Sequence, residues 1–113
     1  MIFVTLFAGD VMRLTEDTFD LYENKLVKFF VPYCGICKAL APVWADIASE
    51  LTEVDVVEVD CTQQVELCAQ HDIHGYPKIR LFFNGKVHAF SGELTYEQLL
   101  LWARGMVTPQ FIF

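Results

Sequence analysis

Two cysteines separated by two residues, Cys34 and Cys37, stand between an apolar run and a helical pattern. The run at residues 26–31 is nearly continuous, as in a central strand covered on both faces, and only Lys28 interrupts it. Beyond Cys37, apolar residues recur with a helical period, at Leu40, Val43, Trp44, Ile47, Ala48 and Leu51. The feature therefore predicts a buried strand joined by a short turn to an amphipathic helix.

The cysteine pair can exchange disulfides, bind a metal ion or form a static disulfide. Backbone amides and the helix dipole stabilise the thiolate of a cysteine at a helix start, and a thiolate is the attacking species in disulfide exchange. A zinc site needs further ligands, but Cys61 and Cys68 are spaced as C-x6-C, which is not a usual zinc half-site. A helix-starting pair in a strand–helix–strand setting favours redox chemistry. No metal or cofactor is expected, because the dithiol itself carries the two electrons.

The rest of the chain predicts an α/β fold with a mixed sheet. Strands and helices alternate before a final hairpin and helix: a strand at 11–14, a short helix capped by Thr15, the strand and helix around the cysteine pair, a strand at 54–59, a helix from about 63 to 71 capped by Thr62, strands at 78–83 and 86–90, and a helix from Thr95 to about Gly105. The hairpin is signalled by Asn84-Gly85, and the last helix by a capping box. Helices between the early strands imply parallel pairing and cover both faces of the sheet, whereas the hairpin pair is antiparallel.

Length and charge limit the classes of function. The 113 residues fit one domain, expected over 10–106, with a C-terminal tail at 107–113. Residues 1–9 are either the remnant of a signal peptide or a first strand. The net charge of −7 argues against nucleic-acid binding, and no apolar run approaches the roughly 20 residues of a membrane-spanning helix. The histidines show no metal-ligand spacing with the cysteines, and His71 and His88 are interpreted as surface residues.

The stretch at residues 29–42, FFVPYCGICKALAP, resembles the active-site stretch of the thioredoxin superfamily, and above all the catalytic domains of protein disulfide isomerases. Further motifs match that family in order and spacing: Val59-Asp60-Cys61-Thr62, Leu67-Cys68, Gly75-Tyr76-Pro77 and Phe82-Phe83-Asn84-Gly85. The resemblance covers about residues 10–105. It implies a thioredoxin fold, with helices on both faces of a mixed sheet.

The resemblance implies a role for several positions. Cys34 is the nucleophile, and Cys37 is the resolving thiol. Pro77 is a cis-proline that faces the disulfide, and the backbone of Tyr76 pairs with an extended substrate segment beside Cys34. Some family members also carry the pair at 61 and 68, which forms either a structural disulfide or two buried thiols.

One departure from the family concerns charge beneath the site. Lys28 stands where the family has a buried acid, and Glu58 stands where the disulfide isomerase branch often has a lysine. The pair is therefore charge-reversed, and we expect the two side chains to meet beneath Cys37. They act either as a proton relay or only as a structural ion pair.

Two further departures lie nearer the surface. Ile36 replaces the usual histidine, so the pKa of Cys34 is expected to be higher, and the disulfide less oxidising, than with histidine there. Glu93 stands where the family often has an arginine that lowers the pKa of the resolving cysteine. Slow reoxidation of the pair is therefore expected.

The resemblance implies a thiol–disulfide oxidoreductase of the disulfide isomerase type. Its substrates are cysteines of unfolded or partly folded proteins, its redox partner is glutathione, an oxidase or a reductase, and its compartment is the endoplasmic reticulum lumen or the secretory pathway. Two alternatives remain open. One is a general thioredoxin-like protein disulfide reductase in the cytosol; the other is a module that binds unfolded chains through Tyr33, Ile36 and Tyr76 with little turnover.

Overall fold

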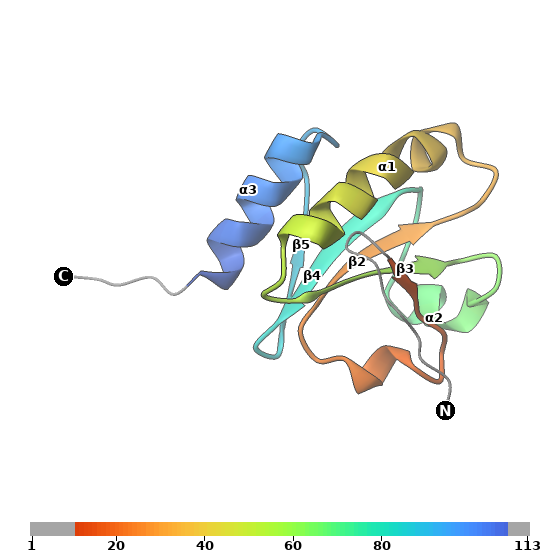
Figure 1. Ribbon diagram of the computed structural model, residues 1–113. Helices are drawn as coiled ribbons and strands as arrows, with labels where there is room; N and C mark the ends of the chain where they lie inside the picture. Colours follow the sequence, from red (N-terminus) through yellow and green to blue (C-terminus); the bar gives the residue numbers. More distant parts are fainter. Residues whose placement is uncertain (1–10, 109–113) are drawn as a thin grey trace, which may run out of the picture.

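The computed structural model describes residues 11–108, so the prediction for residues 1–9 and most of the predicted tail lie outside the described residues. One five-stranded sheet with strand order β1-β3-β2-β4-β5 crosses the molecule (Figure 1). The elements are β1 (Met12–Arg13), the 3-10 turn η1 (Phe19–Leu21), β2 (Lys25–Phe30), α1 (Gly35–Glu50), β3 (Asp55–Asp60), α2 (Val65–Gln70), β4 (Lys78–Phe83), β5 (Lys86–Ala89) and α3 (Tyr96–Val107). The predicted α/β order is confirmed, with α3 ending two residues later than expected.

The sheet is mixed, as predicted. β3 pairs in parallel with both β1 and β2, whereas β4 pairs antiparallel with β2 and β5. In Figure 1, α1 and α3 lie along one face of the sheet, and η1 and α2 lie on the other. Every residue of β2 is buried, which is what its apolar run predicts for a central strand.

Alternation along β2 divides the interior into two cores. Leu26 packs on the side of α1 and α3, together with Trp44, Ile47 and Leu99. The side chains of the opposite face form the second core with η1 and α2: Leu14, Phe19, Val27, Phe29, Val31, Val57, Val59, Cys61, Leu67, Cys68 and Ile73. β2 is thus packed on both faces, and this packing holds in place the turn that leads from β2 to Cys34.

Two predicted helix starts were wrong. After Thr15 the chain forms only turns and the 3-10 turn η1, because the segment before β2 is too short to propagate an α-helix. The Thr15 N–H donates to the Thr18 hydroxyl at 2.9 Å within these turns. The N–H and hydroxyl of Thr62 donate to Asp60 Oδ1 at 2.9 and 2.6 Å. This local turn delays α2 to Val65.

Lys25 and His71 lie in an aromatic cluster between η1 and the sheet. Lys25 is 4% exposed, and its Nζ lies 4.1 Å from the ring centroid of Phe19. The His71 ring lies 5.0 Å from Phe19 and 5.4 Å from Phe82, between centroids. His71 is therefore half-buried and not the freely exposed surface residue that was expected, because the rings of Phe19, Phe29 and Phe82 pack around it.

His71 makes the fold sensitive to acid. Burial lowers the pKa of His71, and the nearby cations of Arg80 and Lys25 lower it further, against the opposing pull of Asp20 and Asp72. The unfolded chain takes up this proton near the ordinary pKa of about 6.5, whereas the folded chain does so only at lower pH. Stability is therefore fully present above the ordinary pKa and is lost as the pH falls toward the lowered one.

We expect His71→Phe to reduce the loss of stability between about pH 7.5 and about pH 5.5. Urea midpoints measured across this range for the wild type and the variant test the expectation. The exposed His74 provides the control, since His74→Gln should retain the slope of the wild type. Parallel curves for the wild type and His71→Phe would contradict the assignment.

Within residues 11–108, no helix combines the length and the apolar character needed to cross a bilayer.

Candidate active site

Cys34 occupies the N-cap position of α1, directly after the turn that leaves β2. Its Sγ accepts a hydrogen bond from the backbone N–H of Cys37 at 3.1 Å. The pKa of Cys34 is lowered from its usual value, first by a hydrogen bond from the Cys37 thiol and further by the N–H groups of Cys37 and Ile36, against an opposing effect of burial. The partly exposed thiol of Cys34 is therefore the one prepared to ionise.

Cys37, one helical turn later, is buried at 3% exposure. Burial, the hydrogen bond to Cys34 and the charge of that neighbour raise the pKa of Cys37 to about 11, although a hydrogen bond from the Val31 backbone and the Lys28 cation act in the opposite direction. The two thiols are thus shifted in opposite directions. The partly exposed thiol of Cys34 therefore ionises more readily than the buried thiol of Cys37.

The loop before β4 faces the outer cysteine. The Tyr76–Pro77 peptide bond is cis, and Cys34 Sγ lies 3.8 Å from the carbonyl oxygen of Tyr76. Three large side chains around this point are exposed: Tyr33 at 78%, Ile36 at 60% and Tyr76 at 36%. An apolar rim therefore surrounds the partly exposed sulfur.

The charge-reversed pair lies together beneath α1. Lys28 Nζ is 3.4 Å from Glu58 Oε1, and the Lys28 side chain is 4% exposed. Both residues line a cavity of about 180 Å³ that also reaches Cys37. Sequence reasoning missed a third member, Arg13, which donates two hydrogen bonds to Glu58 Oε2. Only the parallel pairing of β1 with β3, across 45 residues of sequence, brings it there.

The other cysteine pair is separate from this site. Cys61 follows β3 and Cys68 lies on α2, with the two sulfurs bonded at 2.06 Å and the Cα atoms 5.8 Å apart. Both residues are buried in the core on the η1 and α2 side of the sheet. Among residues 11–108, no three His, Cys, Asp or Glu side chains come together as metal ligands would.

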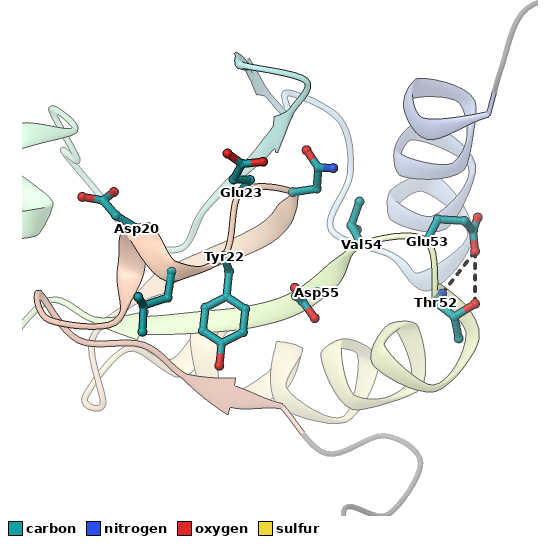
Figure 2. A pocket seen from close by; sticks show the side chains of 9 residues that line it. Asp20, Tyr22, Glu23, Thr52, Glu53, Val54 and Asp55 are labelled. Carbon is teal, nitrogen blue, oxygen red and sulfur yellow. Dashed lines mark hydrogen bonds between the residues drawn. The ribbon is translucent and has the colours of Figure 1, made fainter.

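A wider pocket lies away from the cysteines, between the turn after η1 and the start of β3 (Figure 2). Asp20, Glu23, Glu53 and Asp55 give it an acidic lining. Three of these carboxylates act electrostatically on Lys25, since Asp20, Asp55 and Glu23 each raise its pKa against the stronger lowering by burial. The acidic lining thus has a structural role as the counter-charge of a buried ammonium, and it contains no thiol.

Comparison with known proteins agrees with this geometry. Residues 10–104 match the model of the thioredoxin family. The protein disulfide-isomerase of Humicola insolens is 46% identical over 81 residues, covering 66% of this chain and 16% of that protein. The thioredoxin domain-containing protein 5 homolog of Drosophila melanogaster is 38% identical over 106 residues, covering 88% of this chain and 26% of that protein.

The fold has a close counterpart among solved structures. The first thioredoxin domain of mouse protein disulfide-isomerase A4 superposes with a TM-score of 0.80 at 29% identity, covering 96% of this chain and 82% of that one. The chain therefore corresponds to one domain of its relatives, since it spans only 16% and 26% of the two whole proteins compared. With its mixed sheet, its helix-starting cysteine pair and these relatives, the chain belongs to the thioredoxin family and is homologous to the thioredoxin domains of protein disulfide isomerases.

Proposed function

We propose that the chain is a thiol–disulfide oxidoreductase of the disulfide isomerase type, acting on cysteines of unfolded or partly folded proteins. The observation that carries the proposal is the geometry of the two thiols in the first turn of α1: the partly exposed Cys34 Sγ accepts the Cys37 backbone N–H at 3.1 Å, while Cys37 itself is buried at 3% exposure. The pKa shifts agree with this geometry, since the pKa is lowered at Cys34 and raised at Cys37. A nucleophile must ionise easily, whereas a resolving thiol must not compete with it for the first attack.

The exchange then proceeds in two balanced steps. The Cys34 thiolate attacks one sulfur of a substrate disulfide, a bond forms between the two sulfurs, and the other substrate sulfur leaves with the electron pair. The Cys37 thiolate next attacks Cys34, which releases the second substrate thiolate and leaves the Cys34–Cys37 disulfide. The substrate disulfide is reduced and the pair is oxidised; the reverse sequence inserts a disulfide into a substrate.

The substrate binds to the apolar rim of Tyr33, Ile36 and Tyr76 together with the cis-proline loop. The Tyr76 carbonyl lies beside Cys34 Sγ, so an extended segment of substrate that donates to this carbonyl would place its sulfur near the nucleophile. Tyr33 and Ile36 supply exposed apolar area on the other side of Cys34, and Pro77 fixes the loop. Backbone pairing of this kind accepts many sequences, which suits a catalyst of protein folding.

Beneath the site, Lys28 and Glu58 act on Cys37. The pair lies in the cavity that the buried thiol also reaches, and Lys28 lowers the pKa of Cys37. Two roles are consistent with this placement: a relay for the Cys37 proton, or an ion pair whose cation stabilises the Cys37 thiolate.

The compartment that fits this function is the endoplasmic reticulum lumen or another part of the secretory pathway. A buried disulfide between Cys61 and Cys68 suits an oxidising environment. The partner that resets the dithiol is a small thiol such as glutathione, an oxidase or a reductase. Which of these resets the pair determines whether the domain acts mainly as an oxidase, an isomerase or a reductase.

Two assays of the purified chain test the function: reduction of insulin, and refolding of a protein with scrambled disulfides. Both activities are expected in the wild type and should fall to the uncatalysed background in Cys34→Ser. The second candidate function, a binding module, is favoured by the exposed Tyr33 and Ile36. Suppression of substrate aggregation that survives Cys34→Ser, with no exchange activity in the wild type, would support that module instead.

A further inference from the structure

Three charged side chains on neighbouring strands form a row beneath the first turn of α1. In the sheet register, Lys28 on β2 and Arg13 on β1 both lie opposite Glu58 on β3. Lys28 Nζ is 3.4 Å from Glu58 Oε1, whereas Arg13 Nε and Nη2 donate to Glu58 Oε2 at 2.9 and 2.7 Å. The row holds two cations and one anion, and each oxygen of the carboxylate is engaged by a different cation.

The row borders the cavity that reaches the resolving cysteine. The cavity measures about 180 Å³, and its lining includes all three charged residues, Cys37 and the cationic Lys38 of α1. The Lys28 side chain is 4% exposed, but that of Arg13 is 57% exposed. The row therefore runs from a buried end below α1 to an end that opens to solvent, and the cavity is large enough to admit water.

Of the two active-site thiols, Cys37 is the one that borders the cavity of this row. Cys37 lies on the wall of the cavity, whereas Cys34 does not line it. The Lys28 cation lowers the pKa of Cys37, which burial raises to about 11. Without Arg13, the negative charge of Glu58 would be balanced by Lys28 only, and the row would carry no net positive charge.

We propose that Arg13 is a positioning residue for the resolving step, an inference that rests on the disulfide exchange proposed above. Arg13 holds the Glu58 carboxylate toward the solvent end of the row, so that the Lys28 ammonium is the charge presented to the Cys37 sulfur. In the resolving step the Cys37 proton passes to solvent water, the Cys37–Cys34 bond forms, the bond from Cys34 to the substrate breaks, and the electron pair leaves on the substrate sulfur.

The variant Arg13→Met tests this role, because it removes the charge but keeps an aliphatic stem where the guanidinium lies 5.0 Å from the Phe30 ring centroid. Reduced protein is mixed with saturating oxidised glutathione, and formation of the Cys34–Cys37 disulfide is followed by quenched flow as a function of pH. We expect the pH midpoint of the intramolecular step to rise. Its rate near neutral pH should fall by about threefold to tenfold, since one pKa unit changes the thiolate fraction tenfold.

Four further measurements separate positioning from a merely structural contact. Arg13→Lys should recover most of the pH profile, and Arg13→Glu should move the midpoint in the same direction as Arg13→Met and further. The difference between wild type and Arg13→Met should shrink in about 1 M salt, where the screening length is about 3 Å. The rate at which iodoacetamide alkylates Cys34 should not change, because Cys34 does not line the cavity.

The proposal fails if Arg13→Met lowers the urea midpoint of unfolding but leaves the pH profile in place, since Arg13 would then only hold β1 against β3. It fails equally if Cys34 alkylation slows by the same factor, since the charge of Arg13 would then act on both thiols and not specifically on the resolving step. A wild-type chain that forms no mixed disulfide with glutathione at all would refute the proposed function rather than the role of Arg13.

Discussion

Replacing Cys37 with alanine is expected to turn the domain into a trap that stays covalently bound to its substrates. Cys34 keeps the hydrogen bond from the backbone N–H of residue 37, at 3.1 Å in the wild type, so its thiolate remains stabilised. The substrate sulfur that it captures has no buried thiol to displace it. Turnover should fall to the rate set by added small thiols, and the mixed disulfide should accumulate in proportion to the enzyme.

Incubation of Cys37→Ala with a disulfide-bonded peptide, followed by non-reducing gel electrophoresis and intact mass spectrometry, measures this product. The double variant Cys34→Ser/Cys37→Ala is the matched control and should carry no adduct. Because the Cys37 thiol also donates to Cys34, the first attack should be slower than in the wild type. Catalytic turnover by Cys37→Ala at the wild-type rate would contradict the two-thiol mechanism and transfer the resolving role to another group.

The largest effect on stability is expected for Trp44→Ala. Trp44 on α1 is 0% exposed, and its Nε1 donates to the Val57 carbonyl of β3 at 3.0 Å. Truncation of a buried aromatic side chain costs about 3–5 kcal/mol, to which the lost hydrogen bond contributes. A large part of the stability of a domain of this size would be lost, since such domains are stable by only about 5–15 kcal/mol.

Urea denaturation of the reduced and oxidised protein tests this expectation. Leu101→Ala, at a side chain 72% exposed on α3, is the control and should change the unfolding free energy by less than about 0.5 kcal/mol. Trp44→Phe retains most of the buried area but not the N–H donor, and should fall between the two. An equal effect of Trp44→Ala and Leu101→Ala would mean that α1 is not anchored through this residue.

The parts of the molecule with strong local signals could be predicted from the sequence. The β2 run, the period of α1 and the Asn84-Gly85 turn each depend on neighbouring residues, and all three elements form as expected. The order of the elements also predicts a mixed sheet. Two strands joined through a helix can pair in parallel, whereas two strands joined by a tight turn must pair antiparallel.

Features that depend on distant segments could not be predicted in this way. Arg13 meets Glu58 only through the register of β1 against β3, and His71 enters its cluster only because Phe19 and Phe82 reach it from two other elements. Long-range contacts, rather than composition, decide these positions.

The burial of three of the four cysteines limits how many molecules can form a mixed disulfide with the domain at one time. Cys37, Cys61 and Cys68 are 3%, 7% and 4% exposed, so Cys34 alone of the four cysteines offers its sulfur to other molecules. In the proposed exchange, every pair of electrons that enters or leaves the domain therefore passes through the Cys34 sulfur. A substrate and a recycling partner cannot be attached at the same moment, and each must wait for the other to depart. Substrate and recycling partner therefore react with the domain one after the other, because both need access to the same sulfur.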